Sequence, residues 1–171
     1  MIKRKGYFKA KRGQIKLSAI KRPSKRPGAL QKATGARKRR KKGEITKLKE
    51  QLWLLCRQIT KAQYGNTCYT CGRVVPDGKG MHTAHYLTSS LCSIPLRFDL
   101  RNLKPGCYHC NINLSGNWPA YKKAIEAEMG PEITAQLIKE NEETKGKVYP
   151  KEWFETKIAE YTAILKDIST T

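Results

Sequence analysis

The chain of 171 residues is long enough for one ordinary domain with appendages. Its formal net charge of +21 suits a polyanionic partner, and nucleic acid is the commonest polyanion in a cell. The apolar runs are far too short to cross a bilayer, which excludes a membrane protein.

Basic residues are concentrated in the first segment, residues 1–43, which holds 18 Lys and Arg side chains and no acidic one. The rest of the chain carries only +3 of the formal charge. Prolines and glycines interrupt the segment and no apolar period is present, so too little apolar burial is available to offset the entropy of ordering. We predict a disordered arm that binds nucleic-acid phosphates, with Arg37, Arg39 and Arg40 among its contacts. A solubilising tail is the alternative.

Residues 44–66 are predicted to form the first helix. Its apolar side chains recur at the i, i+3, i+4 and i+7 spacing of one helical face, and Gly65 followed by Asn66 provides a stop. The face consists of Ile45, Leu48, Leu52, Leu55, Cys56 and Ile59. Because Cys56 belongs to this face, we interpret it as a buried structural thiol. Trp53 lies off the face and is expected to cover a neighbouring element.

The next segment, residues 67–118, is predicted to alternate short extended stretches with turns. Residues 74–78 and 81–87 have the composition of two strands, and residues 96–100 that of extended chain or loop. Asn111 is expected to open a short helix. This segment also contains nearly all of the residue types that carry chemistry.

The last segment, residues 119–171, is predicted to be helical. Helices are expected over residues 119–129, from Pro131 to about residue 144, and from Pro150 onward, because proline is favoured in the first turn of a helix. Together the segments predict an α+β fold, in which helices flank a small core that contains strands.

Two Cys-x-x-Cys pairs, Cys68 with Cys71 and Cys107 with Cys110, frame the core segment. Four cysteine thiolates suit tetrahedral zinc, which they bind at about 2.3 Å. Paired spacing in a chain without a recognisable export signal favours metal over disulfides. A closed four-thiolate site cannot activate water, so the predicted Zn²⁺ is structural and contributes to folding. A redox Cys-x-x-Cys, the alternative, would not need a second pair.

The 35 residues between the pairs contain His82, His85 and Asn102, and Asn111 directly follows the last cysteine. This order resembles the HNH, or ββα-metal, nucleases. In that group a strand histidine is the general base, a mid-loop asparagine orients it, and a residue at the start of the helix helps to hold the catalytic ion. Phosphodiester hydrolysis needs a base for water and a divalent cation for the phosphate charge. Histidine titrates near neutral pH, and an amide oxygen suits Mg²⁺ or Mn²⁺.

The motifs CYTCG, AHYLTSS, PLRFDLRNLKPGCYHCN and SGN followed by PAYK narrow the resemblance. In this order, over residues 67–122, they are similar to the NinG/Rap family of lambdoid phages, which are recombination endonucleases that cut branched DNA. The resemblance implies a small zinc-stapled ββα-metal (HNH-like) core over residues 67–118, in which the zinc holds the two ends of the core together. It also implies cleavage of Holliday junctions and D-loops in the host-cell cytoplasm, close to the nucleoid.

The resemblance also assigns roles to single residues. It makes His85 the catalytic histidine, Asn102 the middle asparagine, and Asn111 the residue beside the catalytic Mg²⁺ or Mn²⁺. It makes the four cysteines of the two pairs the zinc ligands. Because resolving a four-way junction requires two cuts, we expect a homodimer, joined through the C-terminal helices or through the helix of residues 44–64.

One position departs from the pattern of the resemblance. Many HNH sites carry an acidic residue or a histidine directly before the base, as a metal ligand, and this chain has Ala84 there. Asn111 alone would be a sparse ligand set for the catalytic ion. His82 and Asp99 are the candidates for the second ligand, or else His85 binds the ion instead of acting as the base. For His82 a surface histidine is the favoured alternative.

Several polar residues near the core are candidates for contacts with DNA. Arg97 and Arg101 are predicted to clamp the scissile phosphate by bidentate contact, and a salt bridge with Asp99 is the alternative. Residues 115–117, SGN, either offer backbone donors to a phosphate or end the short helix. Lys122 is expected to lie on a solvated basic face that points toward the DNA.

Two other classes of protein would also explain the charge and the cysteines. One is a non-catalytic zinc protein that binds DNA, and the other is an RNA-binding protein associated with the ribosome. Neither explains why His85, Asn102 and Asn111 occur in the HNH order. We therefore expect a metal-dependent DNA endonuclease.

Overall fold

The computed structural model describes residues 43–170. The chain divides into two units, and the second of them, residues 40–171, contains all of the described residues. The predicted basic arm and its contacts Arg37, Arg39 and Arg40 lie outside the described residues, apart from residue 43 itself. In the described part of the chain, no helix is long and apolar enough to cross a membrane.

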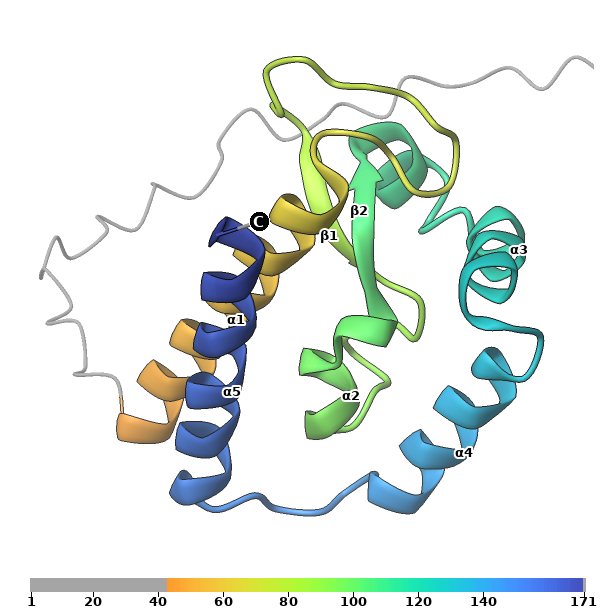
Figure 1. Cartoon of the computed structure of the whole chain (residues 1–171). Helices are drawn as coiled ribbons and strands as arrows, with labels where there is room; N and C mark the ends of the chain where they lie inside the picture. The colour runs from red at the N-terminus through yellow and green to blue at the C-terminus, as the bar shows by residue number, and fades with distance from the viewer. Residues whose placement is uncertain (1–42, 171) are drawn as a thin grey trace, which may run out of the picture. The chain divides into compact units, whose positions relative to one another are not determined.

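Helix α1 (Glu44–Tyr64) confirms the first predicted helix, and it packs along α5 (Lys151–Thr170), as Figure 1 shows. The apolar face of α1 meets Phe154 and Tyr161 of α5 in one hydrophobic cluster. The helix ends at Gly65, whose φ of 62° is accessible to glycine without strain and whose N–H donates to the Lys61 carbonyl at 2.8 Å.

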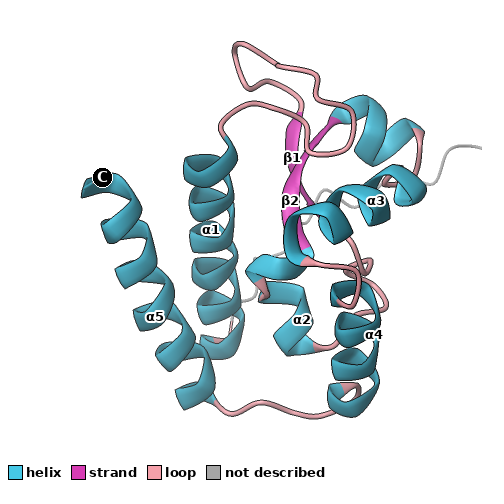
Figure 2. Cartoon of the chain, turned by 45° about the vertical axis from the view of Figure 1, so that its right-hand side comes forward, coloured by secondary structure: helices cyan, strands magenta, loops and turns pink. Residues whose placement is uncertain are grey.

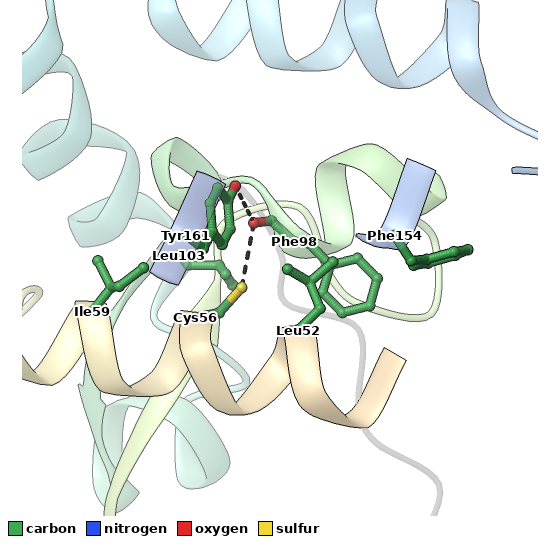
Figure 3. Packing of buried hydrophobic residues seen from close by; sticks show 7 residues of the cluster. All are labelled: Leu52, Cys56, Ile59, Phe98, Leu103, Phe154 and Tyr161. Carbon is green, nitrogen blue, oxygen red and sulfur yellow. Dashed lines mark hydrogen bonds between the residues drawn. The ribbon is translucent and has the colours of Figure 1, made fainter. Parts of the chain in front are cut away.

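The centre of this first cluster is the backbone carbonyl of Phe98 (Figure 3). It accepts hydrogen bonds from the Tyr161 hydroxyl at 2.8 Å and from the Cys56 thiol at 3.5 Å. Cys56 is fully buried, and this burial raises the pKa of its thiol to about 12. The prediction of a structural thiol is therefore confirmed.

The sheet is a two-stranded antiparallel hairpin of β1 (Met81–His85) and β2 (Leu103–Cys107), in which Met81 pairs with Cys107 and His85 with Leu103. All five residues of β2 are buried. The prediction of a strand over residues 74–78 was wrong, because only an isolated bridge joins Val74 to Thr67 there. Pro76 cannot donate to a ladder, and a turn follows it, so pairing stops after one bridge.

The prediction of extended chain or loop over residues 96–100 was also wrong. The chain instead forms α2 (Ile94–Phe98), a short helix with Pro95 in its first turn, and then a 3₁₀ turn over Leu100–Asn102. Leu96 and Phe98 are buried in two different hydrophobic clusters. This burial on two sides favours a helical turn, although the segment is too short for a helical period to be visible in the sequence.

The remaining helices are α3 (Trp118–Met129) and α4 (Ile133–Thr144), which lie on the side of the hairpin away from α1 and α5 (Figure 2). Pro131 does not open the second of them, because residues 131–132 form a turn. Side chains of β1, α2, α3 and α4 form a second hydrophobic cluster: Ala84, Tyr86, Leu96, Tyr121, Ile125, Ile133 and Leu137. The described residues thus form a mixed fold of helices and one small sheet, of the predicted α+β class.

One charged side chain, that of Lys104 in β2, lies inside the fold and is only 1% exposed. Its ammonium group is 2.9 Å from a Glu128 carboxylate oxygen of α3, and it donates to the Tyr64 hydroxyl at the end of α1. It also lies 5.1 Å from the ring centre of Tyr69. Burial lowers the pKa of Lys104, and the Glu128 carboxylate opposes that effect. These contacts join α1, the first cysteine pair, β2 and α3.

Candidate metal centre and active-site cleft

The four paired cysteines meet at one point, and their Sγ atoms all lie within 4.8 Å of one another. Cys68 and Cys71 follow α1, Cys107 ends β2, and Cys110 lies in the π-helical turn His109–Asn113. Tetrahedral zinc with bonds of about 2.3 Å would separate sulfur atoms by about 3.8 Å. The Sγ atoms of Cys71 and Cys107 are 3.9 Å apart. The donor chemistry and the spacing therefore fit the predicted Zn²⁺.

Local polar contacts hold the cysteines in this arrangement. Gly72 has a φ of 68°, a conformation that lets the first pair turn back toward a common centre. The Cys110 N–H points at the Cys107 sulfur at 3.5 Å, and the Asn117 side-chain amide points at the Cys110 sulfur at 3.6 Å. Such donors suit sulfur atoms that carry negative charge. The metal would join the end of β2 to the loop after α1.

His85 lies at the end of β1, where two neighbours hold its ring. Its Nε2 is 3.0 Å from the Arg97 carbonyl oxygen, and its ring stacks on Trp53 with centres 5.2 Å apart and planes 9° apart. A carbonyl only accepts, so Nε2 carries the proton in this contact and Nδ1 is left as an acceptor. Burial lowers the pKa of His85, which favours the neutral ring. A neutral imidazole with one acceptor nitrogen can take a proton.

Asn102 is fully buried, and no hydrogen bond joins it to His85. Its carbonyl oxygen accepts from the Leu87 N–H at 2.7 Å, and its amide donates to the carbonyls of Leu96 at 2.8 Å and Leu87 at 3.3 Å. The predicted orientation of His85 by Asn102 is therefore indirect. Asn102 fixes α2 at Leu96, and the next residue, Arg97, presents the carbonyl that contacts His85.

Asn111 and His85 line the same cleft, which has a volume of about 320 Å³ and lies between β1 and the π-helical turn. Ser89, Ser115 and Trp118 line it as well. Asn111 lies in the middle of the turn and does not open it, contrary to the prediction. The fold thus brings two of the three predicted catalytic residues, His85 and Asn111, to one cleft. The third, Asn102, is buried and holds the backbone of the neighbouring segments.

Ala84 lies beside Asn111, as the environment of Gly106 shows. A Cβ atom on Gly106 would lie 3.1 Å from the Ala84 Cβ and 3.5 Å from the Asn111 Cβ. Ala84 is buried in the second hydrophobic cluster, so this position adds apolar packing where many HNH nucleases have a ligand. His82 lines an adjoining cleft of about 580 Å³ that also reaches Asn111, whereas Asp99 lines neither cleft.

The two arginines of the predicted phosphate clamp differ in their surroundings. Arg101 forms ion pairs of 2.6 Å with both Asp99 and Glu140, which confirms the salt bridge with Asp99 and leaves Arg101 unavailable to clamp a phosphate. The side chain of Arg97 is exposed and lines a cleft of about 380 Å³ together with His85. Lys122 lies 3.7 Å from Glu126, so this lysine is partly neutralised.

The SGN turn ends the short helix and offers no free backbone donors. The N–H of Ser115 donates to Ile112, that of Gly116 to Cys110 and Asn111, and that of Asn117 to Leu114. All three residues have positive φ angles of 49°, 94° and 49° in chain order. The turn aims the chain into α3 and places Trp118 at the rim of the cleft.

Removal of the Asn102 amide is expected to be costly, because three hydrogen bonds meet at this fully buried side chain. For Asn102→Ala we expect the free energy of unfolding to fall by about 2–4 kcal/mol, measured by chemical denaturation. Asn113→Ala is the matched control, since Asn113 is exposed and its amide contacts only the His109 ring. A change below about 0.5 kcal/mol in Asn102→Ala would contradict the central role of this side chain.

These features define a class: a small α+β protein with a cluster of four cysteines that could hold a metal ion, and a cleft that contains a histidine and an asparagine. The chain belongs to the family described as bacteriophage Lambda NinG protein, which matches it over residues 3–170. The predicted family is thereby confirmed. No curated protein and no solved structure matches the chain.

Proposed function

We propose that this protein is a metal-dependent, structure-specific DNA endonuclease of the HNH type that cuts branched DNA in phage recombination. One observation carries the proposal: His85, with its Nε2 held by the Arg97 carbonyl at 3.0 Å, lines the same cleft as Asn111. A fixed histidine with one accepting nitrogen, beside an amide oxygen that suits a divalent cation, is the minimum set for hydrolysis of a phosphodiester.

In the proposed reaction the accepting nitrogen of His85 removes a proton from a water molecule. The water oxygen bonds to phosphorus, the bond from phosphorus to the 3′ oxygen breaks, and the departing 3′ oxygen takes a proton from a solvent water molecule. The products are a 5′-phosphate and a 3′-hydroxyl, as the family resemblance implies. Trp53 restrains the plane of the His85 ring by stacking, and the Arg97 carbonyl restrains its direction. The contribution of the general base is about 10²–10⁴-fold in rate.

The donors in the cleft fit Mg²⁺ or Mn²⁺. Asn111 offers an amide oxygen, and the hydroxyls of Ser89 and Ser115 line the same cleft. Mg²⁺ retains several waters and is commonly bound by one or two carboxylates together with substrate phosphates. No carboxylate of the described residues lines this cleft, so the phosphate of the DNA would supply the charged oxygens. His82, in the adjoining cleft, is the candidate for a further ligand. When bound, the ion would neutralise charge on the phosphate and on the departing oxygen.

The zinc site has a separate role in this proposal. Four thiolates leave no open coordination position, so Cys68, Cys71, Cys107 and Cys110 would hold a structural Zn²⁺. Because Cys110 immediately precedes Asn111, the zinc would fix the side of the cleft that faces His85. A homodimer is proposed on the requirement for two cuts. The apolar faces of α1 and α5 are covered by each other, so the dimer would use another surface.

The proposal is tested by a nicking assay on a synthetic four-way junction and on linear duplex of the same sequences. We expect cleavage of the junction with Mg²⁺ or Mn²⁺, none with EDTA, and much less cleavage of the duplex. Tight binding without cleavage in either metal would favour the non-catalytic zinc DNA-binding protein. Stronger binding to structured RNA than to the junction would favour an RNA-binding protein instead.

Deletion of residues 1–42 tests the proposed role of the basic arm. Each phosphate contact contributes about −0.9 to the slope of log K against log salt concentration. We expect the truncated chain to bind the junction more weakly and with a shallower salt dependence, measured by fluorescence anisotropy over a salt series. An unchanged slope would mean that the arm makes no contact with the DNA.

A further inference from the structure

One face of α1 carries a row of residues that the proposed mechanism uses only at its centre. Lys49, Trp53, Arg57 and Lys61 follow one another at intervals of four residues, so they form a stripe along the helix. Trp53, near the middle, stacks on the His85 ring. The cationic residues therefore lie on both sides of the proposed catalytic histidine, one helical turn before Trp53 and one and two turns after it.

The surface beside this stripe is hollowed along its length. A cleft of about 380 Å³ is lined by Lys49, Trp53 and His85 and by Arg97 of α2. A second cleft of about 580 Å³ is lined by Trp53, Arg57 and Lys61. Trp53 also lines the cleft that contains His85 and Asn111. Trp53 lines all three clefts, so they lie next to one another beside α1 and the proposed catalytic residues, and we call the three together the groove.

The cations beside this groove belong to the larger group of described Lys and Arg residues that form no ion pair with another described residue. Arg57, Lys61 and Arg97 are exposed, and no ion pair with another described residue neutralises them. The cations that do form ion pairs lie elsewhere in the described residues: Arg101, Lys104, Lys122, Lys151 and Lys157. The groove contains two carboxylates, Glu50 at one end and Asp77 at the other. Its central part is thus left with uncompensated positive charge.

We propose that Arg57 and Lys61 form a phosphate-binding track, which guides one DNA strand along α1 to His85. This proposal rests on the proposed function for the position of the cut, but not for the binding itself. Arg57 and Lys61 are about 6 and 12 Å from Trp53 along the helix axis, at 1.5 Å per residue. A DNA strand carries one charge per 3.4 Å of axis, so the track would reach phosphates about two to four nucleotides from the cut, on one side only.

The experiment compares the double variant Arg57→Gln/Lys61→Gln with the matched double variant Lys139→Gln/Lys147→Gln in the full-length chain. The control removes the same charge from exposed residues that lie outside the groove. Binding to a four-way junction is measured without added Mg²⁺ or Mn²⁺, and without a chelator, over a salt series. For the track variant we expect roughly tenfold weaker binding and a salt slope shallower by about two, because each lost phosphate contact removes about one unit. The control should stay within about twofold of wild type.

A salt slope equal to that of wild type in the track variant would overturn the proposal. Phosphate ethylation interference supplies a second measurement: modification on one side of the cut should weaken binding by wild type but not by the track variant. Interference that is symmetric about the cut, or unchanged in the variant, would also overturn it. Because binding without added Mg²⁺ or Mn²⁺ needs no catalysis, a wild-type chain that never cleaves DNA would overturn the nuclease and leave the track in place.

Discussion

His85→Ala is expected to abolish cleavage of a four-way junction while leaving its binding within about twofold of wild type. The variant removes the only histidine that lines the cleft with Asn111, and with it the proposed acceptor for the proton of water. Loss of a general base lowers rates by about 10²–10⁴-fold. The ring is held by one hydrogen bond to Arg97 and by stacking on Trp53, so its removal should not unfold the chain.

The measurements are single-turnover cleavage with Mg²⁺ and equilibrium binding without added divalent cations. His109→Ala is the matched control, because His109 is exposed in the π-helical turn and its ring contacts Asn113. His82→Ala tests whether His82 is a ligand of the catalytic ion or a surface histidine. If His82 binds the catalytic ion, this variant should need more Mg²⁺ for the same rate. Full cleavage by His85→Ala would refute the assignment of the base.

The dependence of cleavage on pH follows from the environment of His85. A general base acts in its neutral form, and burial lowers the pKa of His85 below its ordinary value near 6.5. The rate should therefore rise with pH and reach half of its plateau below pH 6.5, so that cleavage remains near its maximum at pH 7. An acidic limb centred well above pH 7 would contradict a buried neutral histidine as the base.

Removal of the zinc is expected to have the largest effect on stability. Three of the four cysteines are buried, and the metal would join the loop after α1 to the end of β2 and to the π-helical turn. Structural zinc contributes roughly 10 kcal/mol or more to the folding of small domains. For Cys107→Ser, or for wild type with a strong chelator, we expect the melting temperature to fall by more than about 10 °C.

Cys92→Ser is the matched control for this prediction. Cys92 is half-buried and lies outside the four-cysteine cluster, so the same chemical change should leave the bound zinc unchanged. Metal content by mass spectrometry and melting by circular dichroism are the measurements. Stoichiometric zinc and an unaltered melting curve in Cys107→Ser would show that the four thiolates do not act as one site.

The sequence supported reliable predictions wherever the signal was local. The helix of residues 44–64 has an apolar face with a helical period and a glycine stop, and both features act within a few residues. The convergence of Cys68, Cys71, Cys107 and Cys110 was predictable, because two Cys-x-x-Cys pairs have few chemical interpretations. Short segments were predicted poorly. The segment of residues 96–100 is helical because Leu96 and Phe98 are buried in different clusters, and no local pattern records that.

In the candidate site, too, the residue types were predictable from the sequence and their arrangement was not. The sequence alone predicted the family, the α+β class and the cluster of four cysteines, and it proposed His85, Asn102 and Asn111 as site residues. Only the tertiary structure decided how they are arranged, because hydrogen bonds between distant residues are not encoded in spacing. In the tertiary structure Arg101 forms ion pairs with Asp99 and Glu140. Asn102 is buried beneath α2, and Trp53 of α1 stacks on His85. The last contact, between residues 32 positions apart in the sequence, places the cations of α1 beside the cleft.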